Sequence, residues 1–186
     1  MEKKIYIDFD GVIVDSQKQI DYFFRLFGNK ITEDWNRFLK NLNWEKEVLP
    51  NVNEINNSFS ILKELYKMKK DVYIFSRVFS INEAQDKIKY LEDKGIKISF
   101  ISSPGRLDKS KIVIPNKSKI LIDDSKDNVM NWINNSGYGI YFTDNIIDLS
   151  ASKSICFNTD YLKDSSNKVY FKNCVSDLSF LLKKKL

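Results

Sequence analysis

Two aspartates at alternate positions, Asp8 and Asp10, follow the apolar run of residues 5–7 and come directly before Gly11. A short apolar run that ends in a turn signal predicts a buried strand, and the alternation of side chains along a strand predicts that Asp8 and Asp10 point to the same side. Two carboxylates at the end of a central strand repel each other, so a hard divalent cation such as Mg²⁺ is the simplest group to offset their charge. For this short pattern alone, an acidic turn in which aspartate caps a helix is the commoner interpretation. The rest of the chain reverses that preference.

Polar side chains follow two further apolar runs in the same manner. Ser76 ends a run that begins at residue 71, and the pair Asp123 and Asp124 follows the run of residues 118–122. Because such runs alternate with segments of helical periodicity, we expect an α/β fold with a parallel sheet and right-handed crossovers. Ligands bind such sheets at the carboxyl ends of the strands. We therefore expect Ser76 and both pairs of aspartates to meet at one edge of the sheet.

The periodicity of apolar residues predicts the elements that position these side chains. Strands are expected at residues 5–7, 71–77, 96–101, 118–122 and 138–142, and helices at residues 16–27, 53–70, 80–94 and 125–135. In the tail, a strand is expected at residues 168–171 and a helix at residues 175–184.

The composition excludes several classes of chemistry. The 186 residues include no histidine, so Ser-His-Asp and Cys-His catalysis and HExxH zinc sites are excluded. Proton transfer must then come from carboxylates, lysine, tyrosine or water. The net charge of +5 comes from lysines spread along the chain, which favours anionic substrates but is not typical of a nucleic-acid footprint. With no long apolar run and no signal-peptide pattern, we expect a cytoplasmic protein that does not contact the membrane.

Four elements in order resemble the motifs of the haloacid dehalogenase (HAD) superfamily of phosphotransferases. They are DFDGV at residues 8–12, a strand ending in Ser76, a lysine between residues 109 and 119, and ILIDDS at residues 120–125. The resemblance extends over about residues 4–142. It implies a Rossmann-like parallel sheet flanked by helices, formed by residues 1–15 and 61–186, with residues 16–60 as a small helical cap inserted after the first strand.

The resemblance also implies a role for each motif. Asp8 would be the nucleophile that forms an aspartyl-phosphate, and Asp10 would be the general acid for the leaving group and then the base for water. Mg²⁺ would be held by the Asp8 carboxylate, the Asp10 backbone carbonyl and Asp124, with Asp123 beside it. Ser76 would donate a hydrogen bond to a phosphoryl oxygen.

The lysine that balances these carboxylates and the phosphate has four candidates, which are Lys109, Lys111, Lys117 and Lys119. We expect Lys111 to fill the role, because the family lysine commonly precedes a short apolar stretch such as residues 112–114. Lys109 is the second choice. The other candidates are expected to be solvated surface lysines.

Residues 121–142 resemble the 5'(3')-deoxyribonucleotidase group within the superfamily. The similarity lies in the aspartate pair, in Asn128 four residues after its second member, and in Trp132 in the next helix. It implies a nucleoside monophosphate as substrate, with aromatic residues of the cap stacking on the base. The candidates are Phe23, Phe24, Phe27, Trp35, Phe38 and Trp44, although aromatics at helical spacing usually form a core. Ser16 departs from this pattern, because an aromatic residue would suit the position better.

Several other functions are compatible with the same motifs. The substrate could be another small phosphorylated metabolite or the phosphorylated end of a nucleic acid, although no dense basic patch favours the latter. A catalytically silent HAD-like binding module would have no chemical reason to keep Asp10. The order of motifs and the helical insertion disfavour a CheY-like receiver, and the second carboxylate pair disfavours dehalogenase activity. We therefore expect a small phosphorylated substrate, most simply a nucleotide, as the partner.

Overall fold

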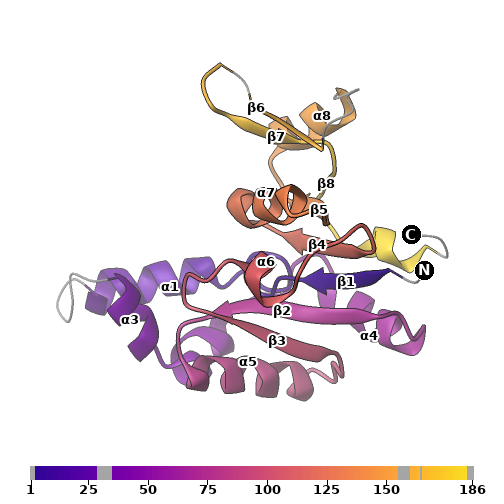
Figure 1. Cartoon of the computed structure of the whole chain (residues 1–186). Helices are drawn as coiled ribbons and strands as arrows, with labels where there is room; N and C mark the ends of the chain where they lie inside the picture. The colour runs from indigo at the N-terminus through magenta and orange to yellow at the C-terminus, as the bar shows by residue number, and fades with distance from the viewer. Residues whose placement is uncertain (1–2, 29–34, 155–159, 164, 184–186) are drawn as a thin grey trace.

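The computed structural model of the protein describes residues 3–28, 35–154, 160–163 and 165–183. Its centre is a six-stranded sheet in the order β3-β2-β1-β4-β5-β8, with parallel pairing throughout (Figure 1). The strands are β1 (Lys4–Ile7), β2 (Val72–Val78), β3 (Ser99–Pro104), β4 (Lys119–Asp123), β5 (Tyr138–Phe142) and β8 (Cys174–Val175). Strands β6 (Tyr161–Lys163) and β7 (Val169–Phe171) form a separate antiparallel pair. The predicted α/β fold with a parallel sheet is confirmed.

Strand β1 lies between β2 and β4 and is buried on both faces, as its continuous apolar run predicts. Ile7 is in register with Ile74 of β2 and with Ile122 of β4, so the next residue of each chain segment, Asp8 and Asp123, reaches the same level. Strands β2 and β3 lie on one side of β1, and the chain then crosses to β4 on the other side. The strand order therefore reverses at the β1/β4 pair, which is the topological switch point where such sheets bind ligands.

Helices cover both faces of this sheet. Their bounds are α1 (Gln17–Phe23), α3 (Trp35–Asn41), α4 (Ser58–Lys67), α5 (Ile81–Asp93), α6 (Lys109–Ile112), α7 (Lys126–Asn134) and α8 (Ile146–Ser154), with shorter or wider turns at η1 (Phe24–Gly28), η2 (Trp44–Val48), η3 (Leu49–Asn51) and η4 (Ser179–Leu182). On one face Trp132 of α7 packs against Tyr6 and Leu121. On the opposite face, Leu65 of α4 and Leu91 of α5 belong to the same apolar cluster as the isoleucines of β1.

The segment between β1 and α4 is helical, as expected for an insertion. Its buried residues Phe38, Leu39 and Trp44 belong to the same apolar cluster as the sheet. The insertion is thus packed onto the sheet and has no separate core among the described residues. Helix α4 begins at Ser58, inside the range assigned to the cap, and the division of the chain into core and cap stays a prediction.

Several details of the predicted pattern are wrong. Helix α4 begins at Ser58, five residues after the expected start at residue 53. Strand β3 begins at Ser99, three residues later than expected. In the described part of the tail the expected helix is reduced to the 3-10 helix η4, because the open edge of β5 pairs with the backbone before it: the Tyr141 N–H donates to Asn173 and the Thr143 N–H to Val175, each at 2.9 Å. Helix α8 was not expected from the sequence. No helix in the described part of the chain is long and apolar enough to cross a membrane.

Candidate active site

Asp8 lies directly after β1, at the carboxyl end of the central strand, and is 7% exposed. Its Oδ1 accepts a hydrogen bond from the Phe9 N–H at 2.8 Å and pairs with Lys109 Nζ at 2.9 Å. Lys109 is fully buried and also contacts Asp123 Oδ2 at 2.7 Å. One ammonium group therefore connects the ends of β1 and β4. Asp8 is held with one oxygen in this ion pair, as a positioned nucleophile would be.

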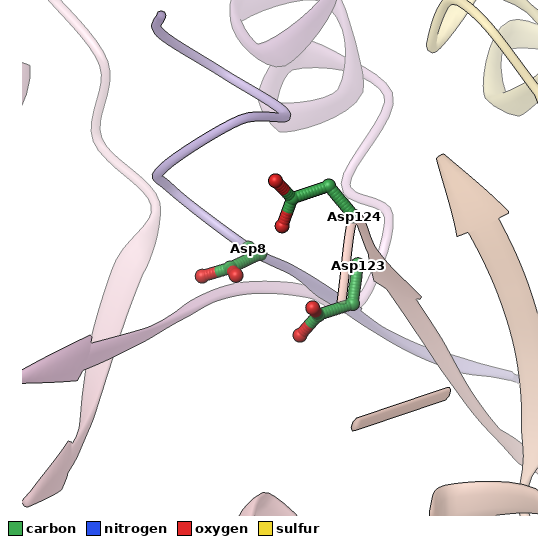
Figure 2. A group of neighbouring side chains, drawn as sticks. All are labelled: Asp8, Asp123 and Asp124. Carbon is green, nitrogen blue, oxygen red and sulfur yellow. The ribbon is translucent and has the colours of Figure 1, made fainter. Parts of the chain in front are cut away.

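The carboxylates of Asp8, Asp123 and Asp124 form a cluster in which one oxygen of each lies within 4.8 Å of the others. Figure 2 shows the three side chains at neighbouring strand ends and pointing to the same side. Gly11 has φ +73°, and a β-carbon there would collide with the Asp124 carboxylate. Glycine in the motif therefore allows the turn after β1 to approach Asp124 closely.

The two members of the second aspartate pair have different surroundings. Asp123 is fully buried, and both of its oxygens are engaged by Lys109 and by the Asn128 side-chain amide, which donates to each oxygen at 3.0 Å. Asp124 is accessible to solvent and lines two pockets. Asp124 is therefore the member of the pair that is open to a ligand, and its role as the direct metal ligand stays a prediction.

The acidity of these groups is shifted by burial and by mutual repulsion. Burial, and then the neighbouring aspartates, raise the pKa of Asp8 well above its ordinary value against the opposing effect of Lys109. The protein atoms crowded around Asp124, together with Asp123 and Asp10, raise the pKa of Asp124 to about 7. For Lys109, burial alone would lower the pKa, but Asp123 and Asp8 raise it above the usual lysine value. Lys109 is therefore charged, and its single positive charge does not balance the negative charges of Asp8, Asp123 and Asp124.

The charges of the site fit a divalent cation. If all groups are ionised, five carboxylates face three cations and leave two negative charges; the groups are Asp8, Asp10, Glu83, Asp123 and Asp124 against Arg77, Lys87 and Lys109. Carboxylate and carbonyl oxygens are the ligands that Mg²⁺ prefers. The residues present could thus hold Mg²⁺ through Asp8 and Asp124, and the Asp10 carbonyl as a third ligand stays a prediction.

Asp10 is held by three donors. Ser16, which is fully buried, donates its hydroxyl to Asp10 Oδ1 at 2.6 Å. Lys87 Nζ donates to Oδ2 at 2.6 Å, and Ser76 Oγ lies 3.3 Å from the same oxygen. Ser76 is thus brought to the site as expected, and the serine at position 16, which departs from the nucleotidase pattern, has a contact that an aromatic residue could not make. The phosphate-binding role of Ser76 stays a prediction.

Sequence reasoning missed Lys87, a lysine of α5 that is fully buried between Asp10 and Glu83. Burial alone would lower the pKa of Lys87, but these two carboxylates raise it above the usual lysine value. The only sequence signal is Glu83 four residues before it, and that spacing is common for exposed ion pairs on helix surfaces. Arg77, which lines the pocket and donates from Nη2 to Asn128 Oδ1 at 3.1 Å, was also not singled out.

The structure corrects the choice of lysine. Lys111 is exposed on α6, and the place beside Asp8 and Asp123 is taken by Lys109. The physical reason is the start of this short helix. The Asp108 carboxylate caps it by accepting from the Ser110 N–H at 2.8 Å, and that cap turns the first residue of the helix, Lys109, toward the sheet.

A pocket of about 270 Å³ opens beside Asp8, Asp10 and Asp124. It lies between the sheet edge and the insertion, and its other wall includes Trp35, Leu39, Trp44, Arg77 and Phe79. This volume is near the small end of the range for ligand pockets, roughly 300–1,000 Å³. The site is therefore suited to a small molecule with an apolar or aromatic part.

Three of the six candidate aromatics are packed among themselves. Phe24, Trp35 and Phe38 lie with ring centroids 4.6–5.6 Å apart, and Phe38 is buried. Trp35 and Trp44 also line the pocket, but Trp44 is 2% exposed, so Trp35 is the candidate among the described side chains that is placed to contact a ligand. The side chain of Phe27 lies outside the described part of the structure.

Comparisons with known proteins agree with this architecture. No protein-family model matches the sequence, and no curated protein matches it. Among solved structures, a haloacid dehalogenase-like hydrolase from Bacteroides fragilis matches with a TM-score of 0.59 and 12% identity over 97% of this chain and 100% of that one. A hydrolase from Pseudomonas syringae matches with a TM-score of 0.55 and 15% identity over 96% and 95% of the two chains. A haloacid dehalogenase-like family hydrolase from Streptococcus pneumoniae has a TM-score of 0.51 and 15% identity over 76% and 85%.

The fold is therefore that of HAD-like hydrolases, with a parallel sheet whose strand ends carry the acidic motifs. At these levels of identity the comparisons define the fold. The chemistry has to be argued from the side chains of this chain.

Proposed function

We propose that this protein is a Mg²⁺-dependent phosphomonoesterase that works through an aspartyl-phosphate on Asp8 and acts on nucleoside monophosphates. The observation that carries the proposal is the joint placement of two aspartates with distinct partners at one pocket. Asp8 is paired with Lys109, and Asp10 is held two residues away by Ser16, Ser76 and Lys87. A nucleophile and a separate acid/base group are the minimum that a two-step phosphoryl transfer requires.

The proposed reaction uses these groups in turn. Asp8 attacks phosphorus, the bond from phosphorus to the ester oxygen breaks, and Asp10 gives its proton to that oxygen. Asp10 then takes a proton from water as the water attacks the phosphorylated Asp8, and inorganic phosphate leaves. Lys109 stabilises the charge that collects on the phosphoryl oxygens, and Ser76 turns its one hydroxyl proton from Asp10 to one of them. Mg²⁺, when bound, lets an anionic nucleophile approach an anionic phosphate by neutralising charge.

The pocket supports a nucleoside as the leaving group. Trp35 offers a flat apolar surface beside the acidic cluster, and Arg77 offers a cation in the same wall. An aromatic base can stack on such a surface and gain about 1–3 kcal/mol. The small volume also disfavours a polymer as the substrate.

The test is phosphate release from a panel of deoxyribo- and ribonucleoside 5'- and 3'-monophosphates, with sugar phosphates beside them, in Mg²⁺ and in EDTA. We expect metal-dependent release that favours nucleotides. Release from sugar phosphates only would keep the mechanism and remove the nucleotide. If no phosphomonoester is hydrolysed by protein that binds Mg²⁺, the proposed activity is wrong.

A further inference from the structure

We propose that Lys87 is a positioning residue for Asp10 and that it ties the orientation of this carboxylate to the docking of the insertion through Trp44. The inference rests on the proposed function, because Asp10 is the acid/base group in it. Lys87 lies on α5 and is 77 residues away from Asp10 in the sequence. Its ammonium group nevertheless contacts the Asp10 carboxylate.

The Lys87 ammonium makes four polar contacts, all short. Nζ lies 2.6 Å from Asp10 Oδ2, 2.8 Å from Glu83 Oε1, 3.1 Å from Ser76 Oγ and 3.2 Å from the Arg77 carbonyl oxygen. One cation thus contacts both the acid/base aspartate and the phosphate-binding hydroxyl. A structural ion pair with Glu83 alone would need neither of these contacts.

The geometry at Asp10 shows why such a contact matters. The Asp10 side chain is 30% exposed and faces the pocket, so its carboxylate has an open side on which it could turn. Ser16 fixes Oδ1, and Lys87 with Ser76 fixes Oδ2. A general acid must lie within hydrogen-bond reach of the leaving oxygen, and a displacement of about 1 Å can cost about 100-fold in rate. Lys87 supplies the charged donor among the three contacts.

Trp44 connects this lysine to the insertion. The Lys87 Nζ lies 4.0 Å from the centroid of the Trp44 ring, and Trp44 is 2% exposed. The next residue of the insertion is also held by α5, because Glu45 pairs with Lys89 at 2.6 Å and its N–H donates to Asp86 at 3.2 Å. Residues of helix α5 therefore contact both the insertion and Asp10. Docking of η2 covers Lys87 and keeps its ammonium directed at the site.

The experiment compares two substrates with different leaving groups. p-Nitrophenyl phosphate leaves as a weakly basic phenolate that hardly needs a proton, whereas an alkyl phosphate turned over by the wild type leaves as an alkoxide that does. In Lys87→Met we expect kcat/KM to fall about 100-fold for the alkyl ester and less than about 5-fold for the aryl ester, with little change in KM. Lys87→Arg, which keeps the charge, should recover part of the loss. Lys67→Met, which removes an exposed lysine of α4 that pairs with Glu64, is the control, and its kcat/KM should stay at the wild-type level for both esters.

Unpaired Glu83 could unfold Lys87→Met, so the double variant Lys87→Met/Glu83→Gln removes both buried charges and should show the same substrate-dependent loss. Trp44→Leu should show it to a smaller degree, because it loosens the cover of Lys87. An equal loss for both esters, or no loss, would overturn the proposal. A crystal structure of the double variant provides a measurement that does not depend on turnover: Asp10 Oδ2 should leave its present position, and an unmoved carboxylate also overturns the proposal. If the wild type hydrolyses neither ester, the proposed function fails, and this structure still decides whether Lys87 positions Asp10.

Discussion

The candidate active site contains two buried lysines, each of which pairs with two carboxylates. We call the groups around Lys109 and around Lys87 the two halves of the site. Lys109 bridges Asp8 and Asp123, and Lys87 bridges Asp10 and Glu83. In each half one ammonium group holds two carboxylates, and Asp8, Asp10 and Glu83 among these four line the pocket. Asp8 and Asp10 are therefore already oriented for the reaction that we propose.

The halves differ in what holds the lysine. Lys109 begins a short helix beside β4, and both of its partners lie at the ends of paired central strands, so its position follows from the sheet itself. Lys87 is covered by Trp44 of the insertion, so its position depends on how that segment docks. Asp8, the proposed nucleophile, is thus fixed by the sheet, and Asp10, the proposed acid/base group, is fixed by an interface. Changes in the Lys109 half should remove the chemistry, whereas changes in the Lys87 half should make it depend on the leaving group.

The largest effect is expected from Asp8→Asn, which removes the nucleophile from the Lys109 half. Turnover should fall by at least about 10⁴-fold, as for removal of a covalent nucleophile. Lys109 keeps Asp123, and one buried acid with an unfavourable raised pKa is gone, so the melting temperature at pH 8 should not fall. Steady-state phosphate release and a thermal melt check both statements. Turnover at the wild-type rate would show that Asp8 is not the nucleophile.

Asp10→Asn is expected to have the next largest effect. The amide keeps the shape, and its single oxygen can accept from Lys87 while its NH2 group donates to Ser16 Oγ, but it can neither give nor take the proton. A loss of about 10³-fold in kcat is expected, within the usual range for general acid–base catalysis. The loss in kcat/KM should be greater for an alkyl than for an aryl phosphate. A uniform loss on the two esters would contradict the assignment of the acid/base role to Asp10.

Lys109→Met, compared with Lys111→Met, tests which lysine belongs to the site. Removing Lys109 leaves Asp8 and Asp123 without their shared cation, and breaking a buried pair in this manner costs about 3 kcal/mol of unfolding free energy. Activity should fall about 100-fold with it. Lys111 is exposed, so its replacement should change the unfolding free energy by less than about 0.5 kcal/mol. Urea denaturation and phosphate release on both variants measure these effects, and equal behaviour of the two would refute the assignment.

The strand-end residues of the site could be predicted from sequence because the sheet fixes them. Asp8, Ser76, Asp123 and Asp124 each follow an apolar run, and parallel strands bring their carboxyl ends to one edge. Lys109 and Lys111 could not be separated, because both precede the same apolar residues and the difference lies in where a single helical turn begins. Such a start depends on one capping contact, from Asp108, which composition does not reveal.

Lys87 was missed for a different reason. The apolar residues of α5 predict that Ala84, Ile88 and Leu91 face the core, yet Ile88 is 37% exposed, and the buried stripe is Glu83, Lys87 and Leu91. The helix is oriented so that Glu83 and Lys87 face inward, where Lys87 contacts Asp10 and Trp44. The burial of this charged pair depends on these partners, which are distant in the sequence. The periodicity of α5 alone does not predict it.

The raised pKa of Asp124 should make the stability of the fold depend on pH, with a smaller effect than the substitutions above. Asp124 has a pKa of about 7 in the folded protein, above the ordinary value of 3.8, so the folded state binds more protons than the unfolded state between these values. Stability without metal should therefore fall as the pH rises from about 4 to about 7. A bound divalent cation replaces the missing positive charge, so Mg²⁺ should raise the melting temperature by more at pH 8 than at pH 5. Thermal melts with Mg²⁺ or EDTA at both pH values measure the difference. An equal shift at both pH values would contradict the charge argument.

The smallest effect is expected where the pocket wall, and neither lysine, is changed. Trp35→Leu removes an indole that lines the pocket while keeping an apolar residue in the aromatic group that it forms with Phe24 and Phe38. KM for a nucleoside monophosphate should rise about 10-fold, the loss of one stacking contact, with kcat nearly unchanged, because the groups at Asp8 and Asp10 are intact. Phe24→Leu is the matched control, since Phe24 packs on Trp35 but is not part of the pocket lining, and its KM should stay near the wild-type value. A lower kcat with unchanged KM in Trp35→Leu would mean that the insertion acts through the Lys87 half and does not hold the base.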